Sequence, residues 1–148
     1  MELGGYWSAY WYNGVIVGSE ITRGLDIFEL VPSGFISQNE IDAAKSVKLD
    51  YFNTQGQVRF TWPKTYSLAG AYLDQLERSK GMDATRIAEA REQLAKAEKA
   101  SGVKQQEALA RLVARLEADA KGAGDAAKVR TLAEAVRELA TEPRLARR

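Results

Sequence analysis

With 148 residues and a formal net charge of +1, from 21 Lys and Arg against 20 Asp and Glu, the chain can form one domain or two small ones. It contains no cysteine and no histidine, which excludes disulfides, thiol nucleophiles, imidazole bases and Cys/His zinc sites. Its charges form no basic stripe for nucleic acid, and no apolar run approaches the roughly 18 residues of a membrane span. We therefore predict no metal, no cofactor, no nucleic-acid partner and no transmembrane segment.

The composition changes abruptly near residue 66. All but one of the 13 aromatic residues (six Tyr, four Phe, three Trp) occur at or before that position, and the rest of the chain is rich in Ala, Leu, Glu, Lys and Arg. The sequence predicts an α+β protein: a short antiparallel β meander resembling a propeller blade, followed by an antiparallel bundle of three to four helices. The expected parts are a β-rich segment at 1–63, a helical bundle at 64–142 and a disordered basic tail at 143–148.

The β-rich segment opens with three predicted strands. The aromatic run at 6–12 favours a strand, and Asn13-Gly14 predicts a type I′ hairpin turn, because both central residues of that turn need positive φ. A β-branched return strand follows at 15–19. The third strand, 25–30, alternates but carries apolar residues on both faces. Three strands cannot cover two apolar faces, so we expect a partner or further strands to do so.

Between the third strand and the bundle the sequence predicts mixed structure. Ser37 and Glu40 have the spacing of a capping box, which opens a short helix reaching about Lys45. Residues 47–52 are predicted as one more strand. Residues 58–62 form a last extended piece, which Pro63 ends.

Four helices follow, over 66–80, 84–100, 103–121 and 126–140. Gly81 is expected as the left-handed residue that ends the first of them, and Asp83 and Asp125 as N-caps of the second and fourth. Short connections make the helices antiparallel neighbours. Their apolar stripes are Leu68, Tyr72, Leu73 and Leu76; Ile87, Ala90, Leu94 and Ala97; Leu109, Leu112, Val113, Leu116 and Ala120; and Val129, Leu132, Val136, Leu139 and Ala140.

A candidate ligand site combines Tyr10, Trp11, Arg23 and Asp26, since aromatic faces stack on sugars and cations. Two other interpretations compete with it. The aromatic rings serve packing between strands, and Arg23 with Asp26 forms a local salt bridge that holds a turn. A hydrolase that uses Glu20 or Asp26 for acid–base work is a further alternative.

The front of the chain resembles the C-terminal end of the LVIVD-repeat proteins, secreted bacterial proteins similar to β-propellers. The stretch that carries the resemblance is residues 6–30, read as YWSAYWYNGVIVGSEITRGLDIFEL, followed by SQNEI at 37–41, TWP at 61–63 and an Ala-rich helical tail. The resemblance implies a secreted or cell-surface binding scaffold, with upstream repeats that would complete the propeller. It transfers no catalytic residue.

These observations predict a non-enzymatic binding or structural module, the C-terminal end of a secreted or surface repeat protein. Its expected partners are another protein, the upstream repeats or a cell-surface component. The alternatives are a small ligand- or carbohydrate-binding domain or hydrolase that uses the aromatic front, and a helical module that self-associates into a homo-oligomer.

Overall fold

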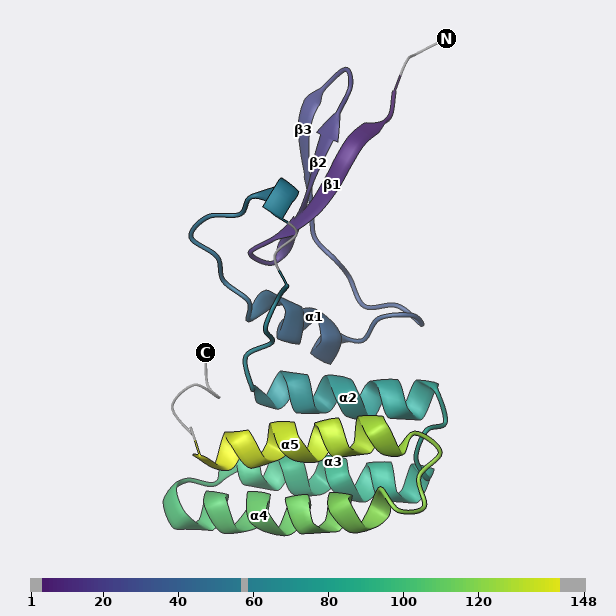
Figure 1. The fold of residues 1–148 in the computed structure, drawn as a ribbon, viewed down its shortest axis with the longest axis vertical. Coiled ribbons are helices and arrows are strands. Elements are labelled where there is room, and N and C mark those ends of the chain that lie inside the picture. The colour runs from purple at the N-terminus through teal and green to yellow at the C-terminus, as the bar shows by residue number, and fades with distance from the viewer. Residues whose placement is uncertain (1–3, 57–58, 142–148) are drawn as a thin grey trace. The chain divides into compact units, whose positions relative to one another are not determined.

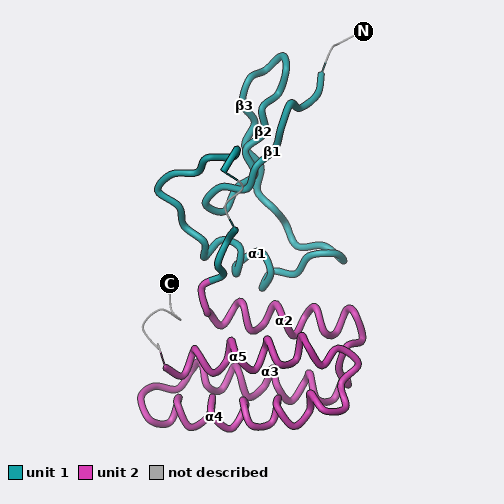
Figure 2. The backbone as a smooth tube through the Cα atoms, in the orientation of Figure 1, with its two compact units in different colours: residues 1–62 teal, residues 63–148 magenta. Residues whose placement is uncertain are grey.

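The computed structural model describes residues 4–56 and 59–141. The chain divides into two compact units between Trp62 and Pro63, beside the predicted boundary at 63 (Figure 2). The first unit contains a three-stranded antiparallel sheet, and the second a four-helix bundle (Figure 1). The predicted α+β class, a meander followed by a helical bundle, is confirmed. The predicted disordered tail at 143–148 lies outside the described residues.

The sheet is a meander of β1 (Tyr6–Tyr12), β2 (Val15–Glu20) and β3 (Gly24–Phe28), in the order β1-β2-β3. Asn13 (φ 50°) and Gly14 (φ 100°) both lie at positive φ between β1 and β2, as a type I′ turn requires. The hairpin that Asn-Gly predicts is therefore confirmed. It fixes the register, with Tyr12 opposite Val15.

Because side chains alternate along each strand, the register sorts them onto two faces. Face A carries Tyr10, Tyr12, Val15, Val17, Leu25 and Ile27. Face B carries Tyr6, Trp11, Ile16, Glu20, Asp26 and Phe28.

A row of aromatic rings covers only part of face A. The ring of Phe52 packs against Tyr10 and Tyr12, with centroids 6.3 and 6.4 Å apart, and the row continues through Phe60 to Trp62. Rings at these separations contribute packing energy beyond their buried area. The packing interpretation of Tyr10 is thus the one the geometry favours.

The short helix α1 (Gln38–Lys45) begins as predicted. The Ser37 hydroxyl accepts from the Glu40 amide at 3.2 Å, and the Glu40 carboxylate accepts from the Ser37 amide at 2.7 Å. This reciprocal capping box satisfies two amide groups that the helix leaves free. The predicted start and end of this helix are confirmed.

The strand predicted at 47–52 is wrong, because no strand forms there. The side-chain amide of Asn13 takes the place of a neighbouring strand: its Nδ2 donates to the Leu49 carbonyl at 2.9 Å, and its Oδ1 accepts from the Leu49 amide at 2.7 Å. The Tyr12 hydroxyl also donates to the Leu49 carbonyl at 3.1 Å. Side chains of the hairpin tip thus satisfy both backbone groups of Leu49. Of the last predicted extended piece, 59–62 forms no strand and Val58 lies outside the described residues.

The second unit is a four-helix bundle. Its helices are α2 (Tyr66–Arg78), α3 (Ala84–Lys99), α4 (Gly102–Asp119) and α5 (Ala126–Thr141). Each helix packs on the next one in the chain, and α5 packs on α2 to close the ring (Figure 1). The predicted stripes face the core, where Leu76, Leu109 and Val129 are fully buried. Leu68 is the exception, because it is buried but does not belong to the core cluster of the bundle. Alanines such as Ala69 and Ala97 share that core with its larger leucines.

Two of the predicted caps are confirmed. The Asp83 carboxylate accepts from the Thr85 and Arg86 amides at 3.0 and 3.2 Å, and the Asp125 carboxylate accepts from the Lys128 amide at 2.9 Å. Each cap satisfies amides at a helix start that have no partner within the helix.

The end of α2 differs from the prediction, because Lys80 and not Gly81 is the left-handed residue, at φ 53°. The Gly81 amide donates to the Leu76 carbonyl at 2.8 Å and the Lys80 amide to the Glu77 carbonyl at 3.1 Å, which together form a Schellman motif. Gly81 is needed for space: a Cβ there would lie 2.9 Å from the Cβ of Asp125. The Asp125 amide donates to the Gly81 carbonyl at 2.8 Å.

This arrangement predicts opposite effects at neighbouring positions. Lys80→Gly is expected to stabilise the bundle by about 1 kcal/mol, because glycine adopts positive φ without steric cost. Gly81→Ala is expected to destabilise it by about 1–3 kcal/mol through the clash with Asp125. Urea unfolding followed by circular dichroism measures both. If Gly81→Ala is neutral, the close approach of the two loops is not what requires glycine.

Polar contacts also cross the bundle. Buried Gln105 donates to the Tyr66 hydroxyl at 2.8 Å, which joins α4 to the first residue of α2. Arg91 on α3 binds Asp74 at 2.6 Å and Glu77 at 2.8 Å on α2. Arg115 on α4 pairs with Glu89 on α3, and Arg137 on α5 pairs with Glu117 on α4. Lys128 on α5 donates to Gln75 on α2 at 2.9 Å.

Candidate functional site

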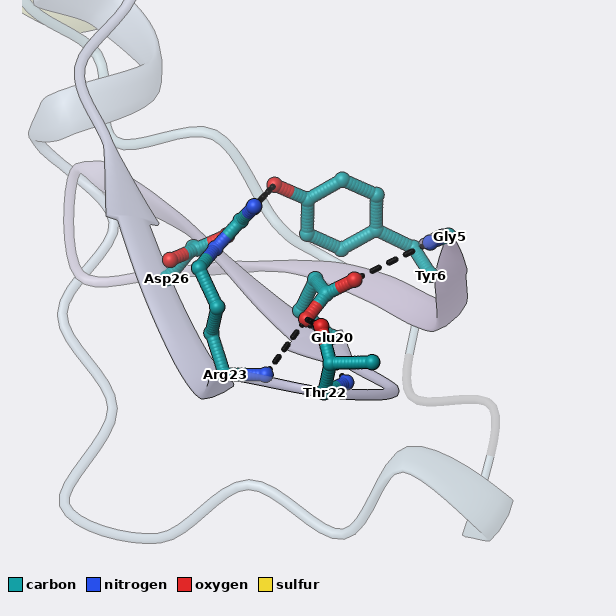
Figure 3. Close-up of polar contacts among 6 residues, drawn as sticks. All are labelled: Gly5, Tyr6, Glu20, Thr22, Arg23 and Asp26. Carbon is teal, nitrogen blue, oxygen red and sulfur yellow. Dashed lines mark hydrogen bonds and ion pairs between the residues drawn. The ribbon is translucent and has the colours of Figure 1, made fainter. Parts of the chain in front are cut away.

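The densest polar contacts of the sheet gather around the turn between β2 and β3. This group, called the turn cluster here, consists of Gly5, Tyr6, Glu20, Thr22, Arg23 and Asp26 (Figure 3). The turn is tight because Gly24, the first residue of β3, lies at φ 97°, a conformation that favours glycine.

Glu20 is the centre of the turn cluster. Its side chain is 3% exposed. One carboxylate oxygen accepts from the Gly5 amide at 3.0 Å, and the other accepts from the Arg23 amide at 2.6 Å and from the amide and hydroxyl of Thr22 at 2.8 and 2.9 Å. The backbone amides of Gly5 and Arg23 lower the pKa of Glu20 to about 2. The carboxylate therefore stays ionised and ties the turn to the segment that leads into β1.

Beside it, Tyr6, Arg23 and Asp26 form a surface triad. The Tyr6 hydroxyl donates to the Asp26 carboxylate at 2.6 Å, and the Arg23 guanidinium donates to the same oxygen at 2.7 Å. The bond from Arg23, then that from Tyr6, lowers the pKa of Asp26, while the bond to Asp26 raises the pKa of Tyr6. The local Arg23–Asp26 salt bridge expected at this turn is thus present.

A glycine positions the Tyr6 ring. The ring lies over Gly18, where an added Cβ would come within 2.8 Å of it, and makes an edge contact with Phe28 at 5.9 Å. Any larger residue at position 18 would displace the ring from its place beside Asp26.

The structure joins only two of the four candidate ligand residues. Arg23 and Asp26 bond directly, whereas Tyr10 lies on face A and Trp11 on face B. The Trp11 indole nitrogen is buried without a hydrogen-bond partner among the described residues. These four residues therefore do not line a common ligand site.

The sequence interpretation missed Tyr6 and Thr22 as members of the turn cluster. A signal existed for Tyr6, because Gly18 interrupts a β-branched strand and leaves room for a large ring from a neighbouring strand. For Glu20, the signal was a lone carboxylate at a strand end directly before a tight turn.

The most exposed apolar side chains of the sheet lie outside the turn cluster. On β3, Leu25 and Ile27 of face A are each 63% exposed and Phe28 of face B is 44% exposed. On β1, Trp7 is 76% exposed. Apolar surface thus remains open on both faces of the sheet.

A shallow groove of about 660 Å³ runs along α3 and α4 of the bundle. Its lining includes Ala108, Ala114 and Ala118 together with the cations Lys96 and Arg115. The groove is also lined by Arg111. All three cations have partners: Lys96 binds Glu92 at 2.5 Å, Arg111 lies 3.8 Å from Glu107, and Arg115 pairs with Glu89. The groove therefore offers little free charge to a ligand.

Within residues 4–56 and 59–141, no group of three acidic residues has the arrangement of a metal site. In the same part of the chain, no helix has the length and apolar character needed to cross a membrane.

Comparisons with family models, with curated proteins and with solved structures found no match to this chain. The resemblance to LVIVD-repeat proteins therefore stays a prediction.

Proposed function

We propose that the chain is a non-enzymatic binding or structural module whose sheet is completed by further β-structure. In this proposal the meander is the last blade of a secreted or surface repeat protein of the LVIVD kind, and the bundle is a helical module appended to it. The resemblance of residues 6–30 supports the assignment to repeats and the location at the cell surface.

The observation that carries the proposal is the apolar exposure of both sheet faces. Leu25 and Ile27 lie open on face A while Tyr6 and Phe28 lie half open on face B. Large contiguous apolar patches on soluble proteins usually mark a binding surface. A propeller blade is flanked on both faces by neighbouring blades, which explains two apolar faces on one small sheet.

The turn cluster supports a structural role more than a catalytic one. General acid–base catalysis needs a group whose pKa lies near the working pH. The pKa values of Glu20 and Asp26 are both lowered, and donors within the chain already occupy both carboxylates. The non-enzymatic assignment would be contradicted if the chain hydrolysed glycosides or esters and Asp26→Asn abolished that activity.

The test of the exposed face uses a dye that binds apolar surface, 8-anilinonaphthalene-1-sulfonate. The native chain is expected to enhance its fluorescence, and Leu25→Thr/Ile27→Thr is expected to reduce that enhancement by the share that face A contributes. Val103→Thr is the matched control, since Val103 is 68% exposed on the bundle. An enhancement that the double variant leaves unchanged would show that face A is not an apolar docking surface.

A further inference from the structure

The two edges of the sheet differ in how open they are. On β1, the pairing with β2 shifts register between Tyr6 and Ser8, which places a bulge at the exposed Trp7. Bulges interrupt an edge and protect it from pairing with other strands. In contrast, β3 pairs with β2 without interruption over residues 24–28 and contains no proline or lysine. The edge that remains open to strand pairing is therefore β3.

The hairpin determines which amides face that open edge. In a two-residue hairpin the closing pair, Tyr12 and Val15, exchanges hydrogen bonds, so the backbone groups of β2 alternate from there. The backbone groups of Val15 and Val17 point toward β1, and those of Ile16 and Gly18 point toward β3. Gly18 of β2 lies opposite Asp26 of β3, so the backbone groups of Asp26 point toward β2. The backbone groups of Leu25 and Ile27 therefore point outward, away from β2.

We propose that β3 pairs with β3 of a second copy of this chain, antiparallel and with the two Asp26 residues opposite each other. Leu25 of each copy then faces Ile27 of the other, and these two pairs exchange four main-chain hydrogen bonds. The product is one continuous six-stranded sheet. Both apolar faces remain open in it, so this inference goes beyond the proposed function and does not depend on it.

The side chains of β3 complement themselves in this register. Leu25 and Ile27 form apolar cross-strand pairs on face A. On face B, Phe28 faces Gly24 of the other copy, where a side chain would meet nothing within 4 Å, so the ring has open space to enter. The two Asp26 carboxylates that face each other are each neutralised by their own Arg23.

The two nearest alternative registers are poorer. A shift that places Ile27 opposite Ile27 brings Asp26 against Phe28 and Leu25 against Glu29. A shift that places Leu25 opposite Leu25 brings Ile27 against Arg23. Each puts apolar side chains against charged ones. The proposed register sets charges only against charges: Arg23 faces Glu29 at the strand ends, and Asp26 faces Asp26, where each carboxylate keeps the Arg23 of its own copy.

The first test is sedimentation velocity of the full chain over a range of concentrations. The wild-type chain is expected to be a dimer, and Ile27→Pro is expected to weaken the dimer roughly 30-fold by removing one outward amide from each copy. Ala9→Pro is the matched control, because the same alternation points the Ala9 amide away from β2 on the bulged edge. Circular dichroism and tryptophan fluorescence establish that each variant is folded.

A wild-type chain that stays monomeric at all concentrations would overturn the proposal. So would a dimer that Ile27→Pro leaves intact, or one that Ala9→Pro weakens equally, because the contact would then lie elsewhere.

A second test reports the register. The chain has no cysteine of its own, so single-cysteine variants give no background. In the proposed register Asp26→Cys places two Cα atoms about 4.5 Å apart, close enough for a disulfide between copies. Leu25→Cys places them about 9 Å apart, too far to bridge. Oxidation is therefore expected to cross-link Asp26→Cys and not Leu25→Cys, and the reverse result would overturn the register.

Discussion

Replacing Glu20 with Gln is expected to unfold the sheet at lower urea than in the wild-type chain and to leave the bundle unchanged. The carboxylate accepts bonds from Gly5, Thr22 and Arg23 while almost fully buried. A neutral amide has one acceptor oxygen, and its NH₂ group would face backbone donors that need an acceptor. We expect this to be among the largest single-substitution effects in the sheet.

The same group gives the sheet a defined pH dependence. The pKa of Glu20 is lowered from 4.5 to about 2, so its contribution to stability is complete above about pH 4.5. As the pH falls from there through 2, the unfolded chain takes up the proton first, and the contribution is lost. The sheet of the Glu20→Gln variant is expected to lack this acid-induced loss.

Tryptophan fluorescence isolates the sheet in this experiment, because Trp7, Trp11 and Trp62 all belong to the first unit and the bundle contains no tryptophan. Circular dichroism reports mainly the helices. The matched control is Glu29→Gln, which removes an exposed acid just after β3. Equal effects of the two substitutions would show that loss of charge alone, and not the bonds to the turn, lowers the stability.

Leu112→Ala is expected to have the largest effect on the bundle, a loss of about 2–5 kcal/mol. Leu112 is 1% exposed on α4. Its loss leaves a cavity, and the alanines of the same core, such as Ala90 and Ala133, have side chains too short to fill one.

The control for this substitution is Val103→Ala on the same helix, where Val103 is 68% exposed. Surface substitutions usually change stability by less than about 0.5 kcal/mol. Urea unfolding followed by circular dichroism separates the two variants. A change below 1 kcal/mol for Leu112→Ala would mean that the bundle core is loosely packed.

Local sequence signals predicted most of the secondary structure. The positive φ of Asn13 and Gly14 follows from the turn that this pair favours, and the capping bonds of Ser37 and Asp83 follow from their spacing to the helix start. The apolar stripes predicted four helices because alternation at helical period reports which face is buried. In each case the residues that decide the structure are near neighbours in the chain.

The errors arose where distant residues decide the structure. The apolar residues at 47–52 favour a strand, but the Asn13 side chain binds the Leu49 backbone in place of one. Gly81 was predicted to end the helix at positive φ. Glycine is instead needed there because Asp125 lies too close for any side chain at position 81. Neither partner can be identified from spacing in the sequence.

The polar clusters could be predicted only in part from the sequence. Gln105 continues the α4 stripe one turn before Leu109, so its position on the helix indicates burial. Its partner Tyr66, however, lies 39 residues away in the sequence. Likewise Arg23 and Asp26 were predicted to pair across three positions, whereas the Tyr6 hydroxyl joins them from another strand. Sequence spacing thus indicates the members of each cluster that are near neighbours in the chain, and not the distant partner.

We infer that the sheet is incomplete on its own while the bundle has a full core. Urea unfolding of the full chain, followed by tryptophan fluorescence and circular dichroism on the same samples, tests it most directly. Coincident transitions are the mark of a single cooperative unit. We expect the fluorescence transition of the sheet at clearly lower urea than the circular dichroism transition of the helices. Superimposable transitions would contradict it, because the sheet would then be as complete as the bundle.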